Sequence, residues 1–134
     1  MNSFINKRSQ NIEYRMERKP AKSFRDLIVW QKAHELVLTI YNVTRNFPKE
    51  ETYGLTSQVR RSSASVAANI AEAFKKKSAL DKLRILNIAQ GSLSETEYHI
   101  LLANDLKYAE LNLIQESAEQ VSRLLEAYMQ AIRK

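Results

Sequence analysis

Apolar residues recur at alternating steps of three and four along most of the chain after Lys22. In segment 23–47 they form two neighbouring rows. The first row is Leu27, Trp30, His34, Val37, Tyr41 and Thr44, and the second is Val29, Ala33, Leu36, Ile40, Val43 and Phe47. Two adjacent rows give a helix an apolar face wider than a two-stranded contact needs. We therefore expect a helix that begins at a cap, Ser23 or Asp26, and ends near Phe47, before Pro48.

The same spacing continues in three further segments, which predict helices over about 48–76, 78–107 and 111–133, with Ser78 capping the third helix. The apolar side of the second helix is Leu55, Val59, Ser63, Val66 and Ile70. The apolar side of the last helix is Ile114, Ala118, Val121, Leu125, Tyr128 and Ile132. Four long helices with short links predict an all-α, antiparallel up-down-up-down four-helix bundle.

The third predicted helix carries polar residues in the middle of an apolar row. That row is Ile85, Ile88, Ser92, Glu95, His99, Leu102 and Leu106. If it faces the interior, Glu95 needs a partner, because an unpaired buried charge is costly. A polar stripe on the second helix offers Arg61 as that partner. We expect a structural network that fixes the helix register, built from Gln58, Arg61, Ser65, Asn69, Glu72, Ser92, Glu95 and His99.

The same residues also permit a catalytic interpretation, with Glu95 and His99 as an acid–base pair. We favour the structural one, since the sequence shows no substrate-positioning group. Di-iron sites in bundles need paired Glu-x-x-His motifs, whereas Glu95 and His99 are spaced Glu-x-x-x-His. The other histidine, His34, lies on an apolar row and is interpreted as a core or interface residue. We expect no catalytic residue, metal or cofactor.

Composition sets further bounds on the class of protein. The 134 residues are the length of one domain, and two glycines and two prolines leave few turns. The absence of cysteine excludes disulfides and thiolate metal ligands. No stretch has the length and apolarity of a signal peptide or a membrane span, so we expect a cytoplasmic protein that does not contact membranes.

The net charge of +6 is unevenly distributed. Residues 1–22 carry six Lys or Arg and two Glu, a net +4, which leaves +2 for residues 23–134. We expect 1–22 to be a flexible basic arm and 23–134 to be the bundle domain. The arm serves either as a solubilising tail or as a contact for phosphates, and both interpretations stay open.

A second basic group surrounds the second helix and the turn that follows it. Such lysines either complement the helix dipole and keep the end of the bundle solvated, or neutralise phosphates together with the arm. The candidate nucleic-acid contacts are Lys7, Arg8, Arg15, Arg18, Lys19, Lys22, Arg60, Lys75, Lys76, Lys77 and Lys82. Because Arg60 and Arg61 are adjacent on a helix, we expect them to serve different faces.

Several motifs, in order, resemble the bacterial four-helix bundle family encoded in 23S ribosomal RNA intervening sequences. The matching residues are Phe24, Leu27 and Trp30, then Gln58, Arg60 and Arg61, then Ser65, Asn69, Ile70, Ala71 and Glu72, and finally Ala89, Gly91, Ser92, Leu93 and Glu95. The resemblance covers about residues 23–134. Ala73 replaces the glycine of the family pattern, which suits a helix that continues through this point.

The resemblance implies an up-down-up-down bundle assembled as a ring-shaped homopentamer. A related branch includes the accessory variability determinant of diversity-generating retroelements, a basic pentamer that binds nucleic acid and a reverse transcriptase. We therefore expect a non-enzymatic oligomer that binds the backbone of RNA or DNA as an accessory factor. The alternative is a structural or docking oligomer that recruits a partner protein, such as a reverse transcriptase, without nucleic acid.

Overall fold

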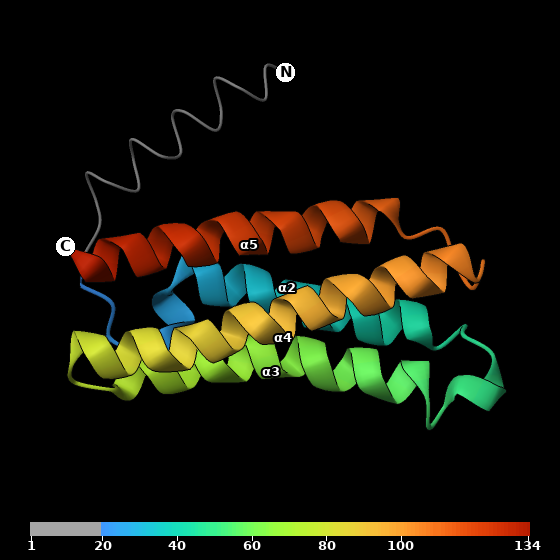
Figure 1. Cartoon of the computed structure of the whole chain (residues 1–134), viewed down its shortest axis with the longest axis horizontal. Helices are drawn as coiled ribbons and strands as arrows, with labels where there is room; N and C mark the ends of the chain where they lie inside the picture. Colours follow the sequence, from blue (N-terminus) through green and yellow to red (C-terminus); the bar gives the residue numbers. More distant parts are fainter. Residues whose placement is uncertain (1–19) are drawn as a thin grey trace, which may run out of the picture.

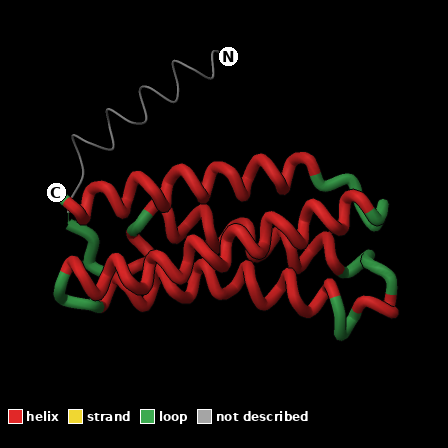
Figure 2. The backbone as a smooth tube through the Cα atoms, in the orientation of Figure 1, coloured by secondary structure: helices red, strands yellow, loops and turns green. Residues whose placement is uncertain are grey.

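The structure is a computed structural model that describes residues 20–134, and four long helices dominate it (Figure 1). These helices are α2 (Ile28–Thr44), α3 (Leu55–Lys75), α4 (Ala79–Asp105) and α5 (Asn112–Arg133). Two short 3-10 turns, η1 (Phe24–Asp26) and η2 (Lys49–Glu51), precede α2 and α3. Residues 20–134 contain no strand (Figure 2), which confirms the predicted all-α class for this part of the chain.

Successive helices run in opposite directions, as an up-down-up-down bundle requires (Figure 1). α2 and α4 each lie beside both α3 and α5, so α2 and α4 occupy opposite corners of the bundle. The starts of α2 and α4 and the ends of α3 and α5 therefore meet at one end. None of the helices in the described residues is long and apolar enough to cross a membrane.

The helix ends confirm one predicted cap and correct two predicted starts. The Ser78 hydroxyl accepts a hydrogen bond from the backbone N–H of Asp81 at 3.1 Å, as expected of an N-cap. Ser23 and Asp26 cap each other around the 3-10 turn η1, and α2 begins only at Ile28. The second helix does not start near Pro48, because a 3-10 turn and Gly54 intervene before Leu55.

The core lies where three of the four helices predict it. The second row of α2 faces inward, with Val29, Ala33, Leu36, Ile40 and Phe47 buried. The predicted apolar side of α3 is buried throughout. On α5 the first four predicted residues are buried, but Met129 completes the row, and Tyr128 and Ile132 are only partly buried against the core.

The predicted interior row of α4 is wrong. Ile85 is its one buried member, whereas Ile88 and Leu106 are 48% and 47% exposed. The row that faces the core is Ile85, Leu86, Ala89, Leu93, Thr96, Ile100 and Ala103. α4 is apolar around much of its circumference, so the three-and-four spacing fits both rows, and packing against α3 and α5 selects the second one.

The sequence predicts His34 to be a core or interface residue, and it is not part of the core of the single bundle; the interface interpretation stays a prediction. Its side chain is exposed, and its ring stacks on Trp30 with centroids 4.9 Å apart and planes 8° apart. Both residues belong to the first row of α2, which is only partly buried in the single bundle. Tyr41 of the same row is 42% exposed.

Candidate functional site

The predicted pair of Arg61 and Glu95 is present and joins α3 to α4. The Arg61 guanidinium donates to the Glu95 carboxylate and also to the Gln58 side-chain oxygen, the latter at 3.1 and 3.2 Å from two of its nitrogens. On the other side, His99 Nε2 lies 3.1 Å from Glu95 Oε2. Glu95 thus contacts both Arg61 of α3 and His99, which lies one helical turn further along α4.

The pair lies at the surface and not in the interior, which corrects the premise of a buried charge. The side chains of Arg61 and Glu95 are 55% and 39% exposed, while that of His99 is 14% exposed. These residues belong to the α4 row that does not face the core, so they lie at the outer edge of the contact between α3 and α4. A pair so exposed stabilises the fold only slightly.

The second half of the network continues along the contact between α3 and α4, toward the C-terminal end of α3. The Ser65 and Ser92 hydroxyls lie 2.9 Å apart, and the Asn69 amide donates to the Ser65 carbonyl at 2.8 Å and to its hydroxyl at 3.0 Å. Glu72 is exposed and hydrogen-bonds to none of the residues in the described part of the chain, so it lies outside the network.

One buried polar contact between α3 and α4 was not predicted from the sequence. The Thr96 hydroxyl donates to Ser62 Oγ at 2.8 Å, and both side chains are fully buried between α3 and α4. The small residues from Ser62 to Ala68 predict a close helix approach here. Thr96, however, lies on the α4 row that was not predicted to face the core.

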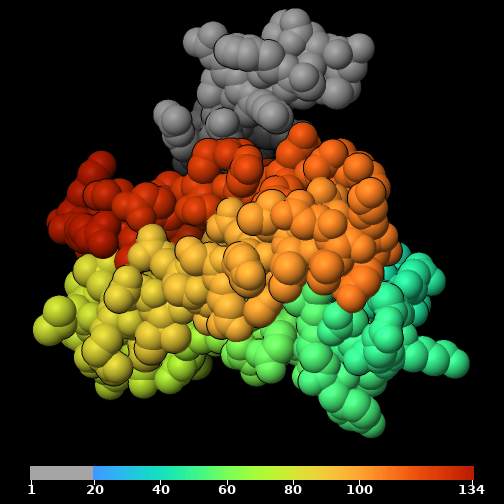
Figure 3. Space-filling view, turned by 45° about the vertical axis from the view of Figure 1, so that its right-hand side comes forward, coloured from blue at the N-terminus to red at the C-terminus, as the bar shows by residue number. Residues whose placement is uncertain are grey.

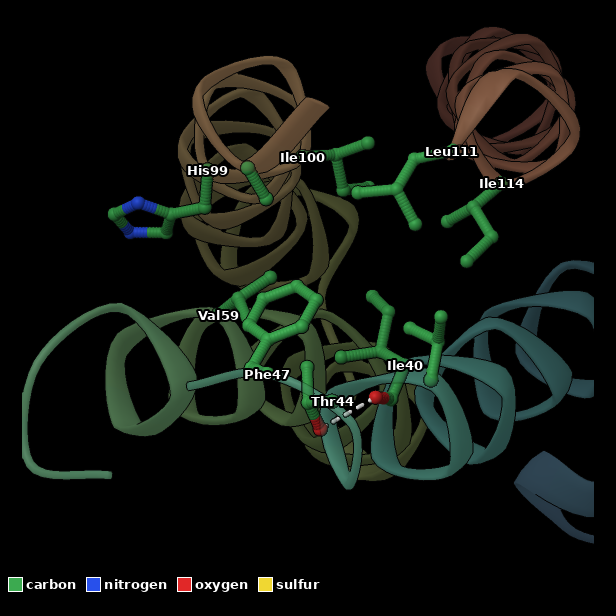
Figure 4. Close-up of a pocket in the computed structure, with 10 residues that line it drawn as sticks. Ile40, Thr44, Phe47, Val59, His99, Ile100, Leu111 and Ile114 are labelled. Carbon is green, nitrogen blue, oxygen red and sulfur yellow. Dashed lines mark hydrogen bonds between the residues drawn. The ribbon is translucent and has the colours of Figure 1, made fainter. Parts of the chain in front are cut away.

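A small cavity next to His99 offers little room for a ligand (Figure 4). Its volume is about 10 Å³, and nearly all its lining is apolar, including Ile40, Phe47 and Val59. The hydroxyl of Thr44 donates to the Ile40 carbonyl at 2.7 Å, and the His99 ring turns away from the other lining side chains. A space of this size holds about one water molecule. Among residues 20–134 no three His, Cys, Asp or Glu side chains gather as a metal site.

Cationic side chains from three parts of the chain gather at the end of the bundle where α3 ends and α4 begins. We call this the basic end and define it by the cations around η1, in and next to the α3–α4 turn, in the first turns of α4 and at the end of α5, which are Lys22, Arg25, Lys75, Lys76, Lys77, Arg84, Arg133 and Lys134. The acidic residues there are Asp26, Glu72, Asp81 and Glu126, and the carboxylate of Glu126 lies 3.6 Å from the Arg133 guanidinium. Two backbone N–H groups, of Lys22 and Ser23, hold the Asp26 carboxylate and lower its pKa. Most of these cations are exposed, with Lys76 half-buried.

Two predicted phosphate contacts have partners within the protein. Lys82 Nζ donates to the carbonyls of Ala73 and Phe74 at 3.3 and 2.9 Å, so it caps the end of α3. Arg60 Nε donates to Thr44 Oγ1 at 2.8 Å, and its guanidinium lies over the Tyr41 ring. The remaining arm candidates lie outside the described residues: Lys7, Arg8, Arg15, Arg18 and Lys19.

Comparison with known proteins agrees with this architecture. A family model described as 23S rRNA-intervening sequence protein matches residues 25–127. The chain is also similar to a crystal structure from Bacteroides thetaiotaomicron, a protein with unknown function from the S23 ribosomal protein family. The two share 28% sequence identity with a TM-score of 0.68, over 76% of this chain and 98% of that one. No curated protein matches the chain.

Proposed function

The chain belongs to the 23S rRNA-intervening sequence protein family, and from this premise we propose a non-enzymatic oligomer that binds nucleic-acid backbone through its basic end. One observation carries the proposal. The antiparallel topology brings the cations of η1, of the α3–α4 turn and of the last turn of α5 to the same end of the bundle. The segment that leads into η1, with which the described chain begins, lies there too.

The chemistry of this end suits phosphates better than bases. Lysine and arginine side chains neutralise phosphate charge and release counterions, which gives affinity with little sequence preference. Reading a base requires side chains held in a groove or stacked on it. Lys75, Lys76 and Lys77 lie at the end of a helix and in the turn after it, which suits long-range attraction more than a fixed geometry. The accessory protein would act in the cytoplasm without a cofactor.

Oligomerisation strengthens the proposal, because the basic end of a single bundle is small. The ring-shaped homopentamer that the family resemblance implies would repeat this end in every subunit. Several weak contacts with one polymer act together, and the later ones form at a high effective concentration.

The decisive experiment removes three cations from each end of the bundle in turn. The triple change of Lys75, Lys76 and Lys77 to Gln should weaken RNA binding, measured by fluorescence anisotropy, and flatten its salt dependence by roughly 0.7 to 0.9 per lost phosphate contact. The matched control changes Arg45, Lys49 and Lys107 to Gln at the opposite end, which alters the net charge equally and should affect binding much less.

Equal losses in the two triple variants would reduce the interaction to overall charge and contradict the proposed site. Protein that does not bind RNA or DNA even at low salt would contradict the function itself. The docking alternative would then gain weight, since Tyr53 and Leu113, exposed by 95% and 78%, lie at the end opposite the basic one. Large exposed apolar side chains are typical of protein-binding surfaces.

A further inference from the structure

A stack of aromatic rings lies beside the basic end, on η1 and the first turns of α2. The rings of Trp30 and His34 are parallel to within 8°, with centroids 4.9 Å apart. Phe24 of η1 meets Trp30 edge-on, with centroids 4.9 Å apart and planes at 65°. Trp30 is partly buried against the core, whereas His34 is exposed. The aromatic stack of Phe24, Trp30 and His34 therefore starts at the core and ends in solvent.

His34 is the outer member of this aromatic stack. Among residues 20–134, Trp30 is the one aromatic ring that stacks on it. The other face of the imidazole is therefore available to a further flat ring. A nucleobase is such a ring, and base–aromatic stacking is sequence-tolerant because every base has a π-face.

The backbone around η1 holds two cations of the basic end beside the aromatic stack. The Asp26 carboxylate accepts a hydrogen bond from the Lys22 N–H at 2.8 Å, and the Gln31 side-chain amide donates to the Arg25 carbonyl at 2.8 Å. The guanidinium carbon of Arg25 lies 5.1 Å from the centroid of the Phe24 ring. Lys22 and Arg25 are thus tied to the same turns that carry the aromatic rings.

The carboxylates near the aromatic stack already have partners. Segment 22–36 contains two acidic residues, Asp26 and Glu35. Backbone N–H groups hold Asp26, and the Glu35 carboxylate lies 3.3 Å from the Lys32 ammonium group. An anionic strand that reaches this segment therefore meets aromatic rings and cations but no unpaired carboxylate of the segment.

We propose that the aromatic stack binds unpaired bases, so that the nucleic acid held by the basic end is single-stranded. The inference rests on the proposed function and specifies its substrate class. Lys22 and Arg25 contact phosphates of the strand, while a base stacks on His34 and extends the parallel pair with Trp30. In a duplex each base already stacks on its neighbours, and taking one out of the stack costs free energy. The stack thus favours single strands without reading their sequence.

Trp30 is the one tryptophan of the chain, so its fluorescence reports directly on the aromatic stack. The single strands oligo(U) and oligo(dT) should both quench this fluorescence as they bind, and their relative affinities separate RNA from DNA. Two other anions serve as controls, a duplex of the same length and inorganic polyphosphate, which has no bases. Both should bind the basic end in a salt-dependent manner, followed by competition with labelled RNA, without quenching Trp30.

Three variants test the role of the exposed ring. His34→Ser should weaken oligo(U) binding by about fivefold or more, the effect of losing one stacked base, and leave polyphosphate binding unchanged. His34→Tyr keeps an aromatic ring and should retain the affinity. The matched control is Tyr53→Ser, which removes a 95% exposed ring at the opposite end and should change neither affinity. Figure 3 shows the segment around η2, next to Tyr53, at the surface of that end. Circular dichroism and urea unfolding check that each variant is folded.

Other results overturn the stacking contact. Salt-dependent binding of oligo(U) without quenching, or an equal loss of oligo(U) and polyphosphate binding in His34→Ser, would contradict it and leave the basic end standing. A His34→Ser variant whose mass changes in light scattering would place His34 in a contact between copies instead. Quenching by oligo(U) that persists at full affinity after the triple change of Lys75, Lys76 and Lys77 would do the reverse, since it would support the stack and contradict the basic end.

Discussion

Arg60 and Arg61 are neighbours in the chain, yet they hold α3 to two different helices. Arg60 reaches Thr44 and the ring of Tyr41 on α2, with its guanidinium carbon 4.6 Å from the ring centroid. Arg61 reaches Glu95 on α4. Successive side chains of a helix point about 100° apart, which sends one arginine to each neighbour. The expectation that the two residues serve different faces is confirmed.

The two arginines should differ in their effect on stability. Arg60→Ala should lower the free energy of unfolding by about 1 to 3 kcal/mol, because it removes a charge-assisted hydrogen bond to the buried Thr44 and the contact with the Tyr41 ring. Arg61→Ala should cost less than about 1 kcal/mol, since its ion pair lies at the surface, where solvent screens the interaction. Urea unfolding at neutral pH, with unchanged m-values, measures both, and equal losses would contradict this ranking.

Ser62 and Thr96 make a fully buried hydrogen bond between α3 and α4. Ser62→Val should lower the free energy of unfolding by about 1 to 3 kcal/mol, because it loses the hydrogen bond and adds volume where no space exists. Ser57→Val, an exposed change on the same helix, should stay within about 0.5 kcal/mol of the wild type. If both variants unfold at the same urea concentration, the tight helix contact is not at Ser62.

The α4 helix shows which parts of the fold sequence reasoning can reach. On α5, apart from the exposed Leu113, the large apolar residues lie on one side, so the spacing specifies the buried row almost completely. On α4 the exposed Ile88 and Leu106 fit a helical row as well as the buried Leu86 and Leu93 do. The row with Glu95 and His99 has the spacing of a core row, although Ile85 is its one buried member.

The wrongly predicted inward row of α4 also explains why only part of the site follows from the sequence. The pairing of Arg61 with Glu95 follows from side-chain chemistry and helix order, which the sequence provides. Its exposure depends on which row of α4 faces inward, and that choice is made by packing against two other helices. The protein partners of Arg60 and Lys82 are long-range or turn contacts, so spacing along one helix carries no signal for them.

The cap of α3 is another contact that local sequence does not specify. Gly54 precedes the helix without a side chain to cap it, and Glu51 takes this role. Glu51 Oε1 accepts from the Leu55 N–H at 3.0 Å, and Oε2 accepts from the Tyr108 hydroxyl at 2.7 Å. Tyr108 lies in the turn between α4 and α5, so this second contact of Glu51 forms only when the bundle is assembled.

This cap should make stability depend on pH below neutrality. The Leu55 N–H, followed by the Tyr108 hydroxyl, lowers the pKa of Glu51. A lowered pKa in the folded state means that the contribution of Glu51 is fully present above its pKa in the unfolded chain and is lost as pH falls through the folded value. Urea unfolding between about pH 6 and pH 3 should show this loss. Glu51→Gln should be less stable at neutral pH and less sensitive to acid across that range, whereas the adjacent Glu50→Gln should keep the wild-type profile. A Glu51→Gln variant that loses stability with acid as steeply as the wild type would show that the cap does not depend on the charge of Glu51.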